Sequence, residues 1–72
     1  MEFGKHFKKC RIEIGLSQKD VAEKLNIHQS NVSDWENDIS RPEYENLIKL
    51  CDIYDVSLYQ ILGLDDPFIS KK

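Results

Sequence analysis

The stretch Gln18–Asn37, QKDVAEKLNIHQSNVSDWEN, contains the pattern that decides the fold. Its apolar and small residues fall in two short runs, Val21, Ala22 and Leu25, then Val32 and Trp35, with Ile27 between them. The spacing places each run on one face of a helix, and Asn26 between them tolerates the left-handed backbone that ends a helix. The pattern predicts a helix over 18–25, a tight turn and a second helix over 29–36, which is the geometry of a helix-turn-helix.

Apolar spacing outside this stretch predicts three further helices, over 2–14, 43–54 and 58–62. The residues expected on their inner faces are Phe3, Phe7, Cys10 and Ile14, and then Leu47, Leu50, Cys51 and Tyr54. Gly15 and Gly63 stand where a helix commonly ends. We see no strand pattern and no internal repeat.

Several polar residues have the positions of helix caps. Ser17 is expected to cap the helix over 18–25, with Asp20 three residues on completing a capping box. Ser57 has the same place before 58–62, whereas His28 is a weak cap for 29–36. We therefore expect an all-α fold, a compact bundle of five short helices, in a domain over 1–64 followed by a tail over 65–72.

Composition and charge narrow the class of protein. The chain has 72 residues, 40% hydrophobic and 32% charged, as in a single soluble domain. No apolar run has the length of a membrane span, and the first ten residues, MEFGKHFKKC, lack the apolar core of a signal peptide. We therefore expect a cytoplasmic protein in which Cys10 and Cys51 are buried free thiols rather than a disulfide.

The net charge of −3 argues mildly against a polyanionic partner, but the charge is unevenly distributed. Residues 1–36 hold six Lys/Arg and six Asp/Glu, whereas residues 37–72 hold four and seven. The half that contains the predicted helix-turn-helix is therefore neutral.

Residues 3–62 contain a set of residue types in a characteristic order. The matching positions are Phe3-Gly4, Phe7, Arg11, Leu16-Ser17-Gln18, Val21-Ala22, Leu25, Trp35-Glu36, Pro42, and Leu50 through Val56-Ser57-Leu58. In this joint order and spacing the chain resembles the lambda-repressor-like, xenobiotic-response-element type of helix-turn-helix regulator. The resemblance implies a compact bundle of four or five helices that binds double-stranded DNA, often as a dimer. It also implies a protein that is prokaryotic or phage-encoded.

The resemblance also implies roles for individual residues. The base-contacting residues would be Gln29, Ser30, Ser33 and Asp34. The residues that contact the DNA backbone would be Gln18, Asn37, Ser40 and Arg41. We add Asn31 to these candidates, and Lys19 because the phosphates require positive charge. Arg11 and Glu36 match a buried ion pair that joins the first helix to the third. Gln18 would also brace the recognition helix over 29–36.

The chemistry of these side chains fits the implied roles. Gln29 can donate and accept together, which matches adenine N6 and N7 in the major groove, whereas Ser30 discriminates little between bases. Asp34 can accept from cytosine N4 and repels phosphates, so it would reject wrong sites. A polar helix face is often only solvated surface, but the position of this one in a helix-turn-helix favours base contact.

Two departures from the family pattern stand out. The recognition helix has no Lys or Arg, and Asp38 stands where the family often has Gly, adding negative charge near the DNA backbone. One small module with few cations binds DNA weakly. We therefore expect a homodimer on a two-fold symmetric site with half-sites about 34 Å apart. The candidate dimer surface is Tyr54, Tyr59, Phe68 and Ile69, because aromatic residues are enriched at interfaces.

Other functions receive less support. The acidic balance leaves open a protein-interaction module on the same fold, such as an antirepressor or an antitoxin-like partner. No nucleophile–base pair or phosphate loop points to an enzyme. His6 and Cys10 lie one helical turn apart, but a structural zinc site needs four ligands, and His28 is a lone histidine. We expect no metal, cofactor, small-molecule ligand or membrane contact.

Overall fold

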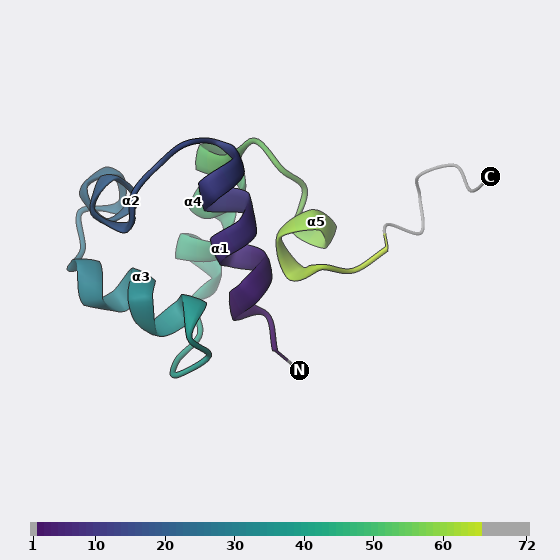
Figure 1. Cartoon of the computed structure of the whole chain (residues 1–72), viewed down its shortest axis with the longest axis horizontal. Coiled ribbons are helices and arrows are strands. Elements are labelled where there is room, and N and C mark those ends of the chain that lie inside the picture. Colours follow the sequence, from purple (N-terminus) through teal and green to yellow (C-terminus); the bar gives the residue numbers. More distant parts are fainter. Residues whose placement is uncertain (1, 66–72) are drawn as a thin grey trace.

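The computed structural model describes residues 2–65 and contains five α-helices (Figure 1). They are α1 (Gly4–Glu13), α2 (Gln18–Leu25), α3 (Gln29–Glu36), α4 (Tyr44–Tyr54) and α5 (Leu58–Leu62). No strand occurs among the described residues, and the predicted all-α fold of five short helices is confirmed. None of these helices is long and apolar enough to cross a bilayer.

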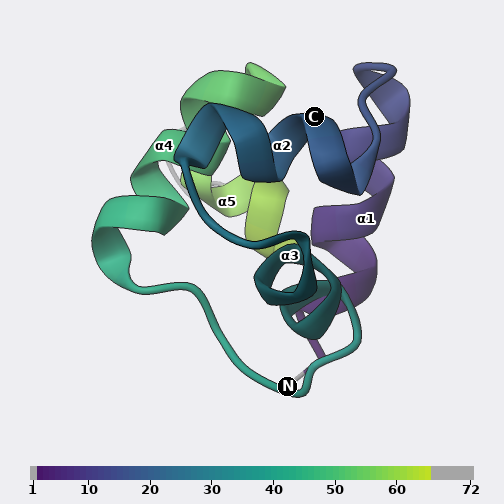
Figure 2. The ribbon, with the colours of Figure 1, turned by 90° about the vertical axis from the view of Figure 1, so that its left-hand side faces the viewer.

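The helix-turn-helix has the predicted boundaries because its local signals are strong. Ser17 accepts a hydrogen bond from the backbone N–H of Asp20 at 3.0 Å, and the Asp20 carboxylate accepts from the Ser17 N–H at 2.9 Å, which completes the capping box. Asn26 ends α2 in the left-handed conformation with φ 58°. Figure 2 shows α2 crossing steeply over α3, with α1 and α4 on either side.

The predicted boundaries of α1 and α4 were less accurate. Phe3 is the N-cap of α1, so the helix starts two residues after the predicted residue 2. It ends one residue before Ile14, and Gly15 follows with φ 82°. Ile14 therefore leaves the apolar stripe on which it was placed and is 46% exposed. The helix α4 begins at Tyr44 because Glu43 is its N-cap.

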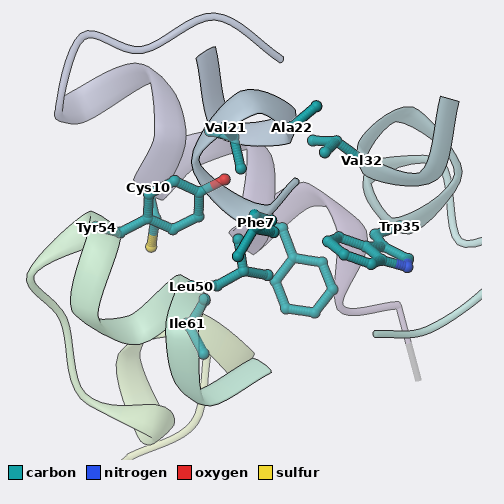
Figure 3. Packing of buried hydrophobic residues seen from close by; sticks show 10 residues of the cluster. Phe7, Cys10, Val21, Ala22, Val32, Trp35, Leu50, Tyr54 and Ile61 are labelled. Atoms are coloured by element: carbon teal, nitrogen blue, oxygen red, sulfur yellow. The ribbon is translucent and has the colours of Figure 1, made fainter. Parts of the chain in front are cut away.

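The core lies where the five helices meet. Its largest fully buried side chains are Leu50, Ile61, Val21 and Val32, and Trp35 packs against the same cluster from α3, as predicted (Figure 3). Burying each such side chain contributes about 1.5–3 kcal/mol. The small Ala22 is also buried and lies between α2 and α3, which make close contact. The core thus fixes the orientation of α2 and α3 through their buried faces.

Tyr54 was placed on the dimer surface, and that prediction is wrong. Its side chain is only 3% exposed and lies beside Cys10 in the core (Figure 3). Burial, with a smaller contribution from the Glu36 charge, raises the pKa of its phenol well above the usual value. Tyr59 is half-buried, and Phe68 and Ile69 lie outside the described residues. Both cysteines are free thiols, as predicted; Cys10 is buried and Cys51 half-buried.

Candidate nucleic-acid interface

The helix α3 turns a polar surface outward at its N-terminal end. Gln29, Ser30 and Asn31 are exposed, whereas Ser33 and Asp34 are half-buried. The sequence placed all five residues at a DNA surface, and the structure leaves the first three most accessible. After α3 the chain turns back toward Asp34, whose backbone carbonyl accepts a hydrogen bond from the backbone N–H of Ile39 at 2.9 Å.

Behind this surface lies the ion pair between Arg11 of α1 and Glu36 of α3. Arg11 Nε donates to Glu36 Oε2 at 2.6 Å and Arg11 Nη2 donates to Glu36 Oε1 at 3.0 Å. The two side chains are 11% and 3% exposed. A third guanidinium nitrogen, Nη1, donates to the Leu16 carbonyl at 2.9 Å. The hydrogen bond to Glu36 raises the pKa of Arg11, so the guanidinium keeps its positive charge.

The ion pair is connected to the surface through two glutamines. Gln18 Nε2 donates to Glu36 Oε1 at 3.0 Å, and Gln29 Nε2 donates to Gln18 Oε1 at 3.5 Å. A carboxylate only accepts hydrogen bonds, so Glu36 fixes which end of the Gln18 amide faces inward. The Gln18 oxygen then faces Gln29. We refer to Arg11, Glu36, Gln18 and Gln29 as the hydrogen-bond chain.

The hydrogen-bond chain leaves Gln29 with the groups that base recognition needs. One N–H of its amide points to Gln18, so its carbonyl oxygen and its second N–H remain for a ligand. An acceptor and a donor on one rigid amide match the N6 and N7 atoms of adenine. The side chain is exposed at the first position of α3, the end of a recognition helix that contacts base edges.

The residues expected at the DNA backbone lie on α2, on α3 and in the segment after α3. Lys19, Asn31 and Ser40 are exposed. The side-chain amide of Asn37 donates to the Ser33 carbonyl at 2.9 Å and to its hydroxyl at 3.3 Å, so Asn37 also closes the end of α3. Arg41 stacks on an aromatic ring, with its guanidinium carbon 5.2 Å from the centroid of Phe3.

Sequence reasoning missed the structural role of Asp38. Its backbone is left-handed, with φ 60°, and its Oδ1 accepts a hydrogen bond from the backbone N–H of Gly4 at 2.9 Å. The available signal was the family's preference for Gly at this position, since Gly adopts positive φ without strain. The carboxylate that was expected to act only through its charge therefore also contacts the first turn of α1.

The described residues offer no group of three or more His, Cys, Asp or Glu side chains that could hold a metal ion. The surface described above consists of amides, hydroxyls, a few cations and the carboxylate of Asp34. Such a surface can bind by hydrogen bonds and charge.

Comparison with known proteins agrees with this geometry. A family model described as helix-turn-helix matches residues 7–61. The chain is 43% identical over 72 residues to the HTH-type transcriptional regulator ImmR of Bacillus subtilis (strain 168), covering all of this chain and 55% of ImmR.

Two relatives from the same organism are described as uncharacterized HTH-type transcriptional regulators. YqaE is 37% identical over 60 residues, which are 83% of this chain and 52% of YqaE. YobD is 40% identical over 53 residues, which are 72% of this chain and 47% of YobD. The chain thus spans about half the length of the curated relatives it matches. These similarities, together with the helix-turn-helix geometry, show that the chain belongs to the lambda-repressor-like helix-turn-helix family of DNA-binding transcriptional regulators, which is not a family of enzymes.

Proposed function

We propose that this chain binds a specific DNA sequence with α3 in the major groove, and that it acts as a repressor on a two-fold symmetric operator as a homodimer. The observation that carries the proposal is the hydrogen-bond chain. It starts at a buried ion pair and ends at the exposed amide of Gln29. A solvated glutamine needs no such support, whereas a base-reading glutamine gains specificity when its amide is held in one orientation.

The other contacts divide into two groups. Ser30, Ser33 and Asp34 would face bases beside Gln29, and Asp34 would disfavour sites that bring phosphate or an acceptor close to its carboxylate. The phosphate contacts would come from the N-terminus of α2, from one residue of α3 and from the segment after α3: Gln18 and Lys19, then Asn31, then Asn37, Ser40 and Arg41. Phosphate contacts set the register, and base contacts set the sequence.

Dimerisation would compensate for the low positive charge. Only Lys19 and Arg41 among these contact residues are cationic, so one protomer would have weak, shallowly salt-dependent affinity. Two protomers double both the phosphate and the base contacts, with half-sites about 34 Å apart. Repression needs no more than occupancy of a site that polymerase also requires, which suits a domain with one DNA surface.

Selection from a random pool of duplex DNA, followed by fluorescence anisotropy on the selected site, tests the proposal. The expected result is an enriched sequence with two-fold symmetry that is bound at least about a thousandfold more tightly than unrelated DNA at physiological salt. Failure to enrich any sequence, with binding that remains non-specific at low salt, would refute it. Sedimentation of the complex gives the number of protomers.

A protein-interaction module, such as an antirepressor or antitoxin-like partner, is the second candidate. The observation that favours it is the outer face of α4, where Tyr44 is 83% exposed and Ile48, one turn later, is 62% exposed. Exposed apolar side chains on adjacent turns commonly bind another protein. Light scattering distinguishes the two functions, because the second predicts a complex with another protein and no DNA site. The double variant Tyr44→Ser, Ile48→Ser should abolish that complex.

A further inference from the structure

We propose that Asp38 is a positioning residue that fixes the angle between α1 and the recognition helix α3. The inference rests on the proposed function only for its consequence in DNA binding. Its structural part depends on the contacts between Asp38, Gly4 and the end of α3.

The first observation is that α1 has no cap of its own. Phe3 occupies the N-cap position and provides no side-chain hydrogen bond, and the first turn of α1 contains no acidic residue. The Gly4 N–H donates instead to Asp38 Oδ1 at 2.9 Å, across 34 positions of sequence. A carboxylate at a helix N-terminus is stabilised by both the hydrogen bond and the helix dipole. Asp38 thus caps α1 from the other end of the helix-turn-helix.

The second observation is that the two helices touch through their backbones at this point. A Cβ atom on Gly4 would lie 2.6 Å from the carbonyl carbon of Glu36 and 2.8 Å from the carbonyl oxygen of Trp35. Neither atom belongs to a flexible side chain. The partially positive start of α1 is therefore packed on the partially negative end of α3, an arrangement that Asp38 holds in place.

The third observation is that the ion pair provides a second fixed point on the same two helices. Arg11 binds Glu36 from seven residues further along α1, a distance of roughly 10 Å along the helix axis. One contact allows two helices to rotate about it, whereas two separated contacts fix their relative direction. Asp38 and Glu36 lie two residues apart at the end of α3, so both contacts act on the same end of the recognition helix.

This role differs from the effect expected of the charge alone. A carboxylate near Ser40 and Arg41 that acted only by repelling phosphate would weaken DNA binding, and its removal would tighten binding. A positioning residue requires the acceptor oxygen. Asn and Gly separate these properties, because both tolerate positive φ and both lack the charge, but only Asn retains an acceptor.

The test compares Asp38→Asn with Asp38→Gly. In the free protein, hydrogen exchange measured by NMR should show roughly tenfold faster exchange of the Gly4 amide in the Gly variant than in the Asn variant. Amides in the middle of α2 serve as the control and should exchange alike in the two variants. On the selected DNA site, the Gly variant should bind several-fold more weakly than the Asn variant, with the same salt dependence.

Equal Gly4 exchange in the two variants would overturn the proposal. It would also be overturned if both variants bound DNA equally and more tightly than the wild type, because Asp38 would then act through its charge. A wild-type protein that binds no selected site refutes the proposed function instead, and the exchange comparison still decides whether Asp38 holds α1.

Discussion

Removing one partner of the buried Arg11–Glu36 pair is expected to destabilise the fold far more than removing both. The carboxylate is 3% exposed and the guanidinium side chain 11%, so solvent screens neither charge strongly. Arg11→Met alone leaves the Glu36 carboxylate buried without its cation, and Glu36→Leu alone leaves the guanidinium without its anion. Each single variant should lose about 3–5 kcal/mol of unfolding free energy.

That loss is large for a chain of 72 residues, whose total stability is expected to be about 4–11 kcal/mol. The double variant Arg11→Met, Glu36→Leu has no unpaired buried charge and should remain within about 2 kcal/mol of the wild type. Urea denaturation followed by the fluorescence of the buried Trp35 measures these differences. With a urea slope of about 1 kcal/mol/M, each single variant should shift the midpoint by about 3 M or more.

The matched control is Glu23→Gln, which also removes one negative charge but on the exposed face of α2. This variant should alter the free energy of unfolding by no more than about 0.5 kcal/mol. Additive losses in the Arg11 and Glu36 double variant would refute the reasoning, since they would mean that the two charges do not compensate each other.

A folded double variant also separates stability from recognition. Gln18 has lost the acceptor that orients it, so selectivity for the DNA site should fall although the fold persists.

Four further outcomes follow from the contacts and pKa shifts described by the structure. Gly4→Ala should destabilise the protein by about 1–3 kcal/mol in thermal unfolding, because its Cβ would overlap backbone atoms at the end of α3; equal or higher stability would contradict that packing. Ser17→Ala should cost about 1 kcal/mol, seen in the same melts. The hydrogen bond from the Ser17 N–H lowers the pKa of the Asp20 carboxyl. The Asp20 carboxylate therefore stabilises the fold above its usual pKa, and this stabilisation is lost as the pH falls through the lowered pKa. Asp20→Asn should flatten the curve of stability against pH below about pH 4, and an unchanged curve would exclude this contribution. Burial raises the pKa of both Cys10 and Cys51, so each thiol should react with an aromatic disulfide reagent more slowly than in unfolded chain, Cys10 the slower; reaction at the unfolded rate would show that the core opens readily.

Features that depend on neighbouring residues could be predicted from the sequence. The capping box at Ser17 and the left-handed Asn26 each involve residues within one helical turn, so their spacing identifies them. The ion pair between Arg11 and Glu36 is formed by distant residues, and it was predictable only because the family pattern implied it. Residue types and spacing thus identified the helix-turn-helix, and the family pattern identified the ion pair between Arg11 and Glu36 that supports it.

Features that depend on how distant segments pack could not be predicted in the same way. Tyr54 lies on the apolar face of α4, but we predicted it at the surface because aromatic residues are enriched at interfaces. In the structure it is buried beside Cys10 of α1. The bond from Gly4 to Asp38 joins residues 34 positions apart, and no periodicity encodes such a pairing. The exposed pair Tyr44 and Ile48 lies on the outer face of α4, and apolar spacing identifies only the inner face of that helix.

The most direct test of base reading by Gln29 is the affinity of the wild type and of Gln29→Ala for the selected site and for all of its single-base variants, over a range of salt concentrations. Gln29→Ala should lose about 1–3 kcal/mol of discrimination at one A·T pair in each half-site. Its preferences at the other base pairs and the salt dependence of its affinity should match those of the wild type. A uniform loss of affinity across all sequences, with every base preference retained, would contradict the claim that the hydrogen-bond chain presents Gln29 to an adenine.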